Sequence, residues 1–336
     1  MTYSRRGFLA LSGLSALAVA GCGTASGSGI RNTTTLRYQG SAGAVTPPEL
    51  AASLGYLGEL KLDWVGNTIS GPQDIQSAAS GQIDFGGAFN GAVVKLASRK
   101  APIKAVISYY GSDKDAYSGY YVLEKSAIRS PRDLIGKKVG MNTLGAHAEA
   151  MLDIYLKNHG LSRAEAEQVE RIVIPPVNTE QSLRQRQIDV AVLGGILRDK
   201  ALETGGVRKL FSDFELRGAF SAGTYVLTDR FIKQNPETVR TFVTGVGKAL
   251  DWSRTTPREE VVARMTEILA RRKRSESADA LKYWRSYGVS APGGRIEAQE
   301  LSVWSDWLTE RGDLKSGQVQ VDGLFTNEFN GKKAAG

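Results

Sequence analysis

The chain has 336 residues, which allows for about two domains at roughly 150 residues each. Its 41% hydrophobic and 23% charged residues are typical of a folded globular protein and exclude a disordered or fibrous one. One cysteine excludes an internal disulfide framework and a cysteine-built zinc site, so we expect no cofactor and no metal. The net charge of +8 is spread along the chain except for one basic cluster at residues 271–274.

Residues 1–21 have the features of an export signal: a charged start with Arg5 and Arg6, a short apolar run, and small residues before Cys22. Residues 4–9 (SRRGFL) resemble a twin-arginine signal, with the general secretory route as the alternative. Residues 19–22 (VAGC) resemble a bacterial lipobox, and the only cysteine stands where a lipobox requires it. We therefore expect lipidation of Cys22, a flexible tether over residues 22–32, and anchoring to the outer face of the cytoplasmic membrane, at the cell surface or in the periplasm.

The next part of the chain alternates strand and helix signals. Thr46 and Pro47 form a helix start, with the threonine as N-cap and the proline at the first helical position. In chain order we expect a strand at residues 35–38, a helix after Thr46, a strand at residues 60–65, a helix at residues 71–80 and a strand within residues 81–87.

A second copy of this unit follows. We expect strands at residues 137–142 and 171–174, helices at residues 146–158 and 179–186, and a strand within residues 187–195. The triplet QID at residues 82–84 recurs 105 residues later, and GYYVL at residues 119–123 recurs as GTYVL 104 residues later. Two matches at nearly one offset indicate two similar lobes.

Alternating strands and helices predict an α/β fold in which each lobe is a mostly parallel sheet flanked by helices, with a cleft between the lobes. The paired strands near Tyr121 and Tyr225 are interpreted as the crossings between lobes. The expected organisation is lobe one at residues 33–120, lobe two at 121–222, the return to lobe one with C-terminal helices at 223–325, and a frayed tail at 326–336.

The basic cluster at residues 271–274 follows an amphipathic helix that includes residues 261–269. A solvated face or helix C-terminus explains it, because the helix dipole favours cations there. Binding of nucleic acid or anionic lipid by the cluster is the alternative, but no recognition motif accompanies it. We therefore expect no nucleic-acid partner.

The chain resembles the periplasmic-type solute-binding proteins of ABC importers over residues 33–325. The motifs that carry the resemblance are the lipobox, the strand–loop–helix order, GQIDFG at residues 81–86 and IRSPRDLIGKKV at residues 128–139. It is most similar to the branch that serves aliphatic sulfonates, taurine, nitrate and thiamine-pyrimidine precursors. The resemblance implies a monomeric type II periplasmic-binding-protein fold that captures a small organic solute or a sulfonate- or taurine-like anion. It also implies delivery to a permease with its ATPase subunits.

In such a fold the ligand lies at loops after strands and at helix N-termini, where backbone N–H groups are free. Four loops occupy these places in the repeated units. The expected ligand-binding residues are Gln39, Gly40, Ser41, Phe89, Asn90, Asn142, Thr143, Gly145, Gly194 and Gly195, with Tyr109 and Arg198 as further candidates.

Several of these residues have a second interpretation. Arg198 could pair with an anion or lie on a helix surface, and Tyr109 could stack on a ligand or pack in the core. His147 is interpreted as a helix-face residue, with ligand contact as the alternative. The family's lobe-two loop often carries serines that hold an anion, whereas this loop has one hydroxyl, at Thr143. Because of this departure, a pyrimidine or aromatic solute is the alternative to a sulfonate as the ligand.

Enzyme function is not expected. The chain contains no GxSxG, HExxH or P-loop motif. An enzymatic branch of the fold, in thiamine-pyrimidine biosynthesis, has a cysteine-clustered site, and no cysteine follows Cys22. A transcriptional effector domain would need a cytoplasmic address, which the export signal contradicts. A surface lipoprotein without a transport role is the remaining alternative.

Overall fold

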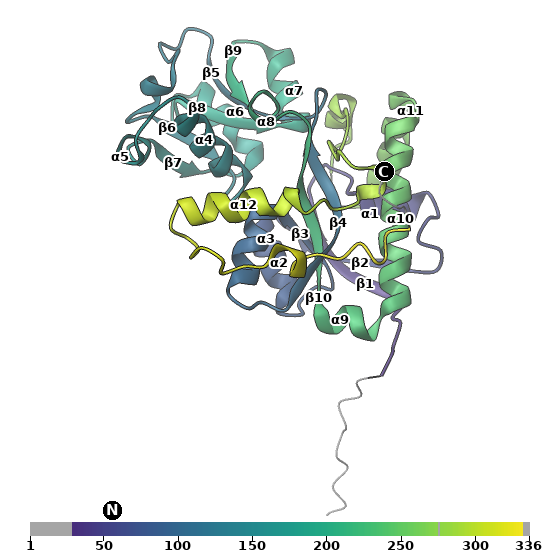
Figure 1. Ribbon diagram of the computed structural model, residues 1–336. Coiled ribbons are helices and arrows are strands. Elements are labelled where there is room, and N and C mark those ends of the chain that lie inside the picture. The colour runs from purple at the N-terminus through teal and green to yellow at the C-terminus, as the bar shows by residue number, and fades with distance from the viewer. Residues whose placement is uncertain (1–28, 275, 332–336) are drawn as a thin grey trace, which may run out of the picture.

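The computed structural model describes residues 29–274 and 276–331, in which strands and helices form two α/β lobes (Figure 1). The described strands form three sheets, with the orders β1-β2, β3-β10-β4 and β7-β6-β8-β5-β9. We call the part around the first two sheets lobe one and the part around the third sheet lobe two. The alternating pattern of the sequence therefore does produce an α/β fold with two lobes.

Lobe one takes both ends of the described chain. Its first segment comprises β1 (Thr35–Gly40), α1 (Pro47–Ser53), β2 (Lys61–Asn67), α2 (Gly71–Ala79), β3 (Gly86–Phe89), α3 (Asn90–Ser98) and β4 (Ile103–Ser112). Its second segment comprises β10 (Phe220–Thr228), α9 (Asp229–Gln234), α10 (Pro236–Thr255), α11 (Arg258–Arg272) and α12 (Gln299–Glu310), with 3-10 turns η2 (Asp279–Tyr283), η3 (Pro292–Gly294) and η4 (Val321–Gly323).

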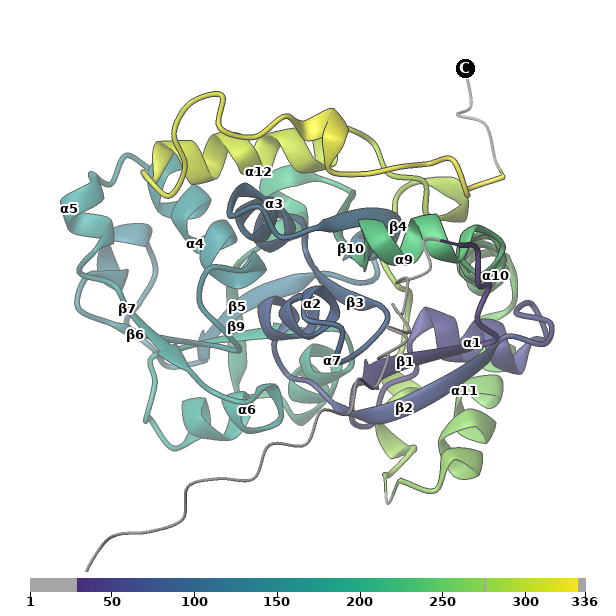
Figure 2. The ribbon, with the colours of Figure 1, turned by 90° about the horizontal axis from the view of Figure 1, so that it is seen from below.

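Lobe two is the segment between these two. It comprises β5 (Ser118–Leu123), η1 (Pro131–Leu134), β6 (Lys138–Met141), α4 (His147–Asn158), α5 (Arg163–Ala166), β7 (Glu170–Val173), α6 (Pro176–Arg184), β8 (Val190–Gly194), α7 (Gly195–Thr204), β9 (Val207–Ser212) and α8 (Asp213–Arg217). Seen from below, α12 of lobe one lies beside α4 of lobe two (Figure 2).

The helix start at Thr46 is confirmed. The Thr46 hydroxyl accepts from the Glu49 backbone N–H, and the Glu49 carboxylate accepts from the Thr46 N–H, which forms a capping box. The helix α10 buries Phe242, Val246 and Leu250 in the core of lobe one. These local signals explain why the elements of lobe one form where the sequence predicts them.

The sheets are less parallel than expected. The strand β10 runs antiparallel to both β3 and β4, and β5 runs antiparallel to both β8 and β9. The reason is that β10 and β5 are the first strands after a crossing between lobes. Each enters its sheet from the opposite end to the strands of the repeated βα units. The remaining pairs, β1 with β2 and β6 with β7 and β8, are parallel.

The crossings lie earlier than the sequence suggested. The strand β5 pairs only within the lobe-two sheet from Ser118 onward, so Tyr121 lies inside that sheet. The strand β10 pairs with lobe-one strands from Phe220 onward, so Tyr225 lies inside lobe one. The two crossings are therefore residues 113–117, which we call the first crossover, and residues 213–219, the second crossover, which includes α8 at the end of lobe two.

The first part of the expected frayed tail, residues 326–329, is packed against lobe one. The Thr326 N–H donates to the Ala105 carbonyl, and the side chain of Asn327 bonds to both backbone groups of Ile296. Phe329 is buried against the lobe-one core. These hydrogen bonds and the burial of the Phe329 ring hold the chain against lobe one as far as residue 329.

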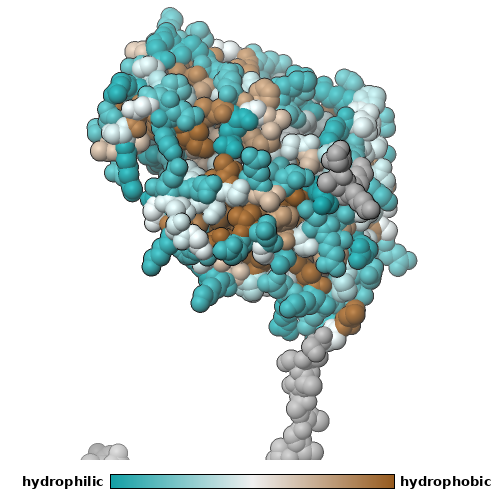
Figure 3. All heavy atoms as spheres, in the orientation of Figure 1, coloured by the Kyte–Doolittle hydropathy of each residue, from teal (hydrophilic) through white to brown (hydrophobic). Residues whose placement is uncertain are grey.

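The export signal and Cys22 lie outside the described residues. Within the described residues, no helix is both long enough and apolar enough to cross a membrane. No group of three or more metal-ligating side chains comes together in the same part of the chain. The face seen in Figure 3 is mainly hydrophilic, with smaller apolar areas near its centre.

Candidate functional site: the cleft between the lobes

A cleft of about 350 Å³ lies between the lobes and is lined from both sides. Lobe one contributes the start of α2, the end of β3, and Tyr109 and Tyr110 of β4. Lobe two contributes Ser118, the loop before α4, and the starts of α4, α6 and α7. The volume is suited to one small molecule, since ligand sites range from about 300 to 1,000 Å³.

Five helices begin at this cleft, namely α2, α3, α4, α6 and α7. None of the five has a side-chain hydrogen bond at its N-cap. Of the helices that begin elsewhere, α1, α5, α8 and α9 are capped by Thr46, Ser162, Ser212 and Thr228, whereas α10, α11 and α12 also lack a side-chain cap bond. Free N–H groups and the positive ends of helix dipoles therefore face the cleft, where an acceptor atom of a ligand would be stabilised.

One wall of the cleft is aromatic. Phe89 and His147 lie nearly parallel, with ring centroids 5.5 Å apart, and Tyr109 contacts Tyr110 edge-on at 4.9 Å. Tyr109 also stacks on Tyr225 at 4.1 Å, which fixes its ring against the sheet. Burial raises the pKa of Tyr109 and of Tyr110, so both phenols stay neutral. Among the described lining residues there is no lysine, arginine, aspartate or glutamate.

The two lips of the cleft touch each other. Asn142 Nδ2 of lobe two donates to the Ile69 carbonyl of lobe one at 3.2 Å. The Ser70 hydroxyl donates to Thr143 Oγ1 at 3.4 Å. The lobes are therefore in a closed arrangement, and any opening of the cleft breaks these two bonds.

The sequence-predicted residues divide into two groups. Five line the cleft: Phe89, Tyr109, Asn142, Thr143 and Gly194. The other seven do not line it, and they are Gln39, Gly40, Ser41, Asn90, Gly145, Gly195 and Arg198.

Two of the seven are glycines that shape the loops at the cleft. Gly145 and Gly195 have φ of 68° and 49°, a left-handed conformation that glycine adopts without strain. The Gly145 N–H donates to Glu149 Oε2 at 2.6 Å, which ties the cleft loop to α4. These glycines therefore position the loop and helix starts that do line the cleft.

Arg198 is turned away from the cleft. Its guanidinium pairs with Asp199 at 2.6 Å and donates to the carbonyls of Asp115 and Tyr117 at 2.8 and 3.1 Å. The side chain is buried, and its guanidinium lies 3.9 Å from the centre of the Tyr117 ring. Each of its three guanidinium nitrogens donates to its neighbour Asp199 or to the first crossover, so Arg198 supports the connection between the lobes.

Asn90 is also a structural residue. It is fully buried, and its Nδ2 donates to the carbonyls of Glu300 and Ser221 at 3.0 and 3.4 Å. These contacts join α3 to α12 and β10. The asparagine follows directly on the cleft residue Phe89, but its side chain is turned into lobe one, because successive residues at the start of a helix point in different directions.

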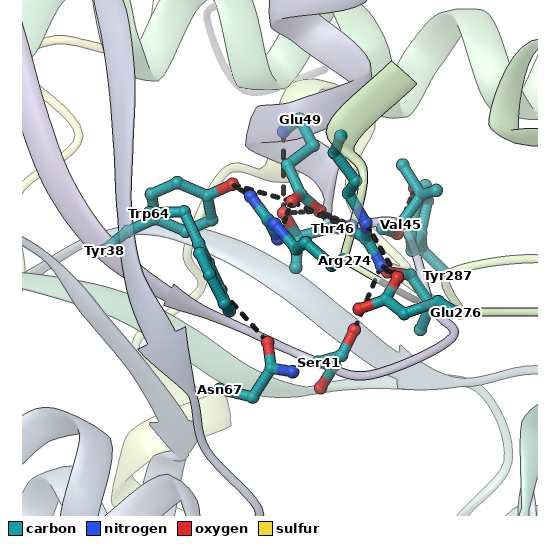
Figure 4. Close-up of polar contacts among 12 residues, drawn as sticks. Tyr38, Ser41, Val45, Thr46, Glu49, Trp64, Asn67, Arg274, Glu276 and Tyr287 are labelled. Carbon is teal, nitrogen blue, oxygen red and sulfur yellow. Dashed lines mark hydrogen bonds and ion pairs between the residues drawn. The ribbon is translucent and has the colours of Figure 1, made fainter. Parts of the chain in front are cut away.

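Gln39 and Gly40 end β1, and Ser41, which follows them, borders a polar cluster that is shown in Figure 4. The cluster consists of Tyr38, Glu49, Arg272, Arg274 and Glu276. Arg272 contacts both oxygens of the Glu49 carboxylate at 2.9 and 3.0 Å, and Arg274 contacts one of them at 3.1 Å. Arg274 Nη2 donates to the Tyr38 hydroxyl at 2.9 Å. This arrangement pairs two cations with two carboxylates inside lobe one.

The basic cluster lies at a helix C-terminus, as expected, because Arg271 and Arg272 end α11, but only part of the cluster is solvated. The side chains of Arg272 and Arg274 are only 8% and 10% exposed, whereas Arg271 is 74% exposed. Arg272 also donates to the carbonyls of Ala44 and Ser41 at 3.0 and 3.4 Å. The end of α11 thereby holds the loop after β1, and one of the expected ligand residues, Ser41, is bonded by it.

Sequence reasoning missed the starts of α2 and α6 as parts of the cleft. Gly71 and Pro176 both line it, and they are 105 residues apart, the same offset as the repeated QID triplets. Thr179, one turn into α6, lines it too. The repeat was therefore a usable signal, because equivalent elements of two similar lobes face a shared cleft.

Comparisons with known proteins agree with this architecture. The family model "NMT1/THI5 like" matches residues 45–260. A protein of Brucella abortus (strain 2308) that is named as a binding protein is 27% identical over 199 residues, which cover 57% of each chain. The 4-amino-5-hydroxymethyl-2-methylpyrimidine phosphate synthase of Candida albicans (strain WO-1) is 26% identical over 227 residues, covering 63% of this chain and 64% of the synthase. The chain thus spans less than two thirds of the length of these curated relatives.

Two solved structures have a similar fold. The alkanesulfonate-binding protein SsuA from Xanthomonas axonopodis pv. citri, bound to MOPS, matches with a TM-score of 0.68 at 20% identity, covering 88% of this chain and 99% of that one. The periplasmic nitrate-binding protein NrtA from Synechocystis PCC 6803 matches with a TM-score of 0.70 at 13% identity, covering 89% and 88%. Since the family model covers more than half of the chain, this protein belongs to the NMT1/THI5-like family, with the two-lobed fold of periplasmic binding proteins.

Proposed function

We propose that this protein is the extracytoplasmic substrate-binding component of an ABC importer. It captures a small, flat, uncharged solute with a ring in the interlobe cleft and delivers it to a membrane permease. The observation that carries the solute class is the cleft lining, which has an aromatic wall and, among the described residues, no lysine, arginine, aspartate or glutamate. Rings stack on such a wall, and uncharged solutes need no counter-ion.

The polar groups of the cleft fit the edge of such a solute. Asn142 can donate and accept, Thr143 and Thr179 carry hydroxyls, and the tyrosine phenols are neutral donors. A pyrimidine or a similar heteroaromatic ring offers ring nitrogens and exocyclic groups at this edge. The relation to a pyrimidine phosphate synthase supports the same class.

A sulfonate- or taurine-like anion is the second candidate. The five uncapped helix starts at the cleft favour it, because backbone N–H groups and helix dipoles can hold an oxyanion without a cationic side chain. The SsuA structure was solved with MOPS, a molecule with a ring at one end and a sulfonate at the other. The two candidates therefore differ in the charge of the solute, which is a property that can be tested.

The export signal and the lipidation of Cys22 complete the proposal, since a lipid anchor would hold the binding protein at the membrane that contains its permease. A monomer suffices for this role, and no catalytic step is needed. No cysteine follows Cys22, so a cysteine-clustered active site of the synthase kind is not available to this chain.

The proposal is tested by a thermal-shift screen of the purified protein. The compounds are 4-amino-5-hydroxymethyl-2-methylpyrimidine, cytosine, benzoate, taurine, MOPS and nitrate, each with wild type and with Asn142→Ala. A compound present at 100 times its Kd stabilises the folded state by about 2.7 kcal/mol. We expect the uncharged pyrimidines to raise the Tm of wild type and to do so less in Asn142→Ala.

Stabilisation by taurine, MOPS or nitrate instead would replace the ring-solute class by the anion class. Equal stabilisation of both proteins would place the binding site outside the cleft. Stabilisation by none of the six compounds would reject both candidate classes as proposed here.

A further inference from the structure

His147 is carried by lobe two but its ring lies among rings of lobe one. The ring stacks on Phe89 of β3 at 5.5 Å and contacts Tyr110 of β4 at 6.1 Å and Phe220 of β10 at 5.8 Å. We call Phe89, Tyr110 and Phe220 the aromatic box, and each comes from a different strand of one lobe-one sheet. His147 also lines the cleft, so the same ring faces both the solute site and the opposite lobe.

Asp213 lies behind this ring, at the start of the second crossover. Its carboxylate is fully buried. Oδ1 accepts from the Ser112 hydroxyl at 2.8 Å and from the Ser118 N–H at 3.0 Å. These two residues are the last of β4 and the first of β5, which are the two ends of the first crossover. One carboxylate therefore contacts both connections between the lobes.

The second oxygen of Asp213 faces the histidine. Oδ2 lies 3.0 Å from His147 Nε2, and the pair lacks the alignment of a hydrogen bond. Neither atom has another hydrogen-bond partner among the described residues. A buried carboxylate oxygen is stable only with a donor, so a small rotation that aligns the N–H with Oδ2 is favourable.

The other groups that face this pair carry no competing charge. Tyr110 of the box is neutral, because burial, and after it the charge of Asp213, raises the pKa of its phenol. Phe89 and Phe220 are apolar. Among the described residues, His147 is the only basic side chain within ion-pair distance of Asp213. The position of the imidazole is therefore set by Asp213 on one side and by the aromatic box on the other.

We propose that His147, positioned by Asp213, couples solute binding to closure of the two lobes. Opening of the cleft moves α4 away from β3 and withdraws the ring from the aromatic box, whereas closing returns it. A solute seated against the ring stabilises only the closed arrangement, and differential contact of this kind is what shifts such an equilibrium. Asp213 is a positioning residue, because it acts through His147 and through the crossover. The inference rests on the proposed function, since it assigns a role to the same cleft.

The test uses no solute, so its outcome is independent of the ligand screen. Small-angle X-ray scattering gives the radius of gyration of the full chain for wild type, Asp213→Asn, His147→Ala and His147→Phe. The asparagine amide oxygen can still accept from Ser112 and Ser118, so Asp213→Asn removes chiefly the charge that faces His147. His147→Phe keeps a ring for the aromatic box. Thermal unfolding confirms that each variant is folded.

We expect a larger radius of gyration for His147→Ala and for Asp213→Asn, and a value equal to wild type for His147→Phe. Asp213→Asn should have no further effect in the His147→Phe background, because the phenylalanine ring does not depend on the carboxylate. The matched control is Asp84→Asn, which removes a carboxylate that bonds to Arg37 in lobe one, away from both crossovers. It should match wild type.

Two results would overturn the inference. A radius equal to wild type in both His147→Ala and Asp213→Asn would show that this contact does not affect closure. A larger radius in Asp213→Asn alone, persisting in the His147→Phe background, would show that the carboxylate acts on the crossover without the ring. Neither result would reject binding of a solute in the cleft, and a negative ligand screen would leave the scattering result valid.

Discussion

Among single residues, Asp74 has an unusual environment. It is buried near the start of α2, where Oδ2 accepts from the Gly87 N–H at 2.7 Å while Oδ1 has no hydrogen-bond partner in the described structure. Burial raises its pKa to about 7, although the bond from Gly87 acts in the opposite direction. The folded protein therefore binds a proton at Asp74 at a pH where the unfolded chain, with a pKa near 3.8, has released it.

The sign of the resulting pH dependence follows from this difference. Between about pH 4 and pH 7 the unfolded chain has released this proton while the folded protein still holds it, so the free energy of unfolding falls as the pH rises over that range. Asp74→Asn is neutral at every pH and keeps an acceptor for Gly87. We expect its stability, relative to wild type, to rise by a few kcal/mol, at about 1.4 kcal/mol per pKa unit, between pH 4 and pH 7. Urea unfolding at several pH values measures it, with exposed Glu59→Gln as control; a constant difference would contradict the assignment.

Asn90 and Asn142 are two asparagines that can be compared directly. Both were expected to bind the ligand, but the structure directs Asn90 into lobe one and Asn142 to the lip of the cleft. Loss of the buried amide removes the donor that joins α3 to the carbonyls of Ser221 and Glu300, so Asn90→Ala should lower the free energy of unfolding by about 1–3 kcal/mol. We expect little change in solute affinity. Urea unfolding and calorimetric titration check both parts, and reduced affinity with unchanged stability would be the contrary result.

Among the elements, the sequence predicts the βα units well because their signals are local. The capping pair at Thr46 and the prolines near the starts of α1 and α2 act within a few residues. The cleft residues Phe89, Asn142 and Gly194 could be placed because each lies at the end of a strand of a repeated unit or directly after it. Positions fixed by distant segments could not be predicted. The loop after β1 is held by α11, which is more than 200 residues away in the sequence. No local sequence pattern predicts that contact.

The cluster of Glu49, Arg272 and Arg274 makes this long-range contact measurable. Glu49→Ala would leave two nearly buried guanidinium groups without their shared carboxylate, and breaking such a buried pair costs about 3–5 kcal/mol. Arg271→Ala, one residue from Arg272 but exposed, should change stability by no more than about 0.5 kcal/mol. Thermal or urea unfolding compares the two. Similar stabilities for both variants would mean that the cluster does not hold the loop.

For the whole molecule, the two crossovers decide how the lobes move. Arg198 contacts the first crossover and Asp213 contacts both, so the residues that connect the lobes are themselves buried and bonded. The sequence left two interpretations of Arg198 open, an anion partner or a residue on a helix surface. Only the tertiary structure shows that each of its guanidinium nitrogens already donates to Asp199 or to the first crossover.

The attachment of the molecule to the membrane is a separate expectation, carried by residues 19–22. If Cys22 is lipidated, Cys22→Ser should remove the acyl chains and shift the protein from the membrane fraction to the soluble fraction, because each buried CH₂ contributes about 0.8 kcal/mol to anchoring. Fractionation of the producing cells, with immunodetection of wild type and variant, measures the shift. Unchanged partition of Cys22→Ser with membranes would reject the lipobox interpretation.

The central claim is that one solute is held between the lobes by groups from both of them. Calorimetric titration tests it most directly, using the compound that stabilises wild type in the screen against Tyr109→Phe of lobe one, Asn142→Ala of lobe two and the exposed control Arg271→Ala. Removal of one hydrogen-bonding group at a buried ligand costs about 1–3 kcal/mol, or roughly 5- to 150-fold in Kd. We predict a loss of this size in both cleft variants and none in the control. Wild-type affinity in both Tyr109→Phe and Asn142→Ala would contradict the account.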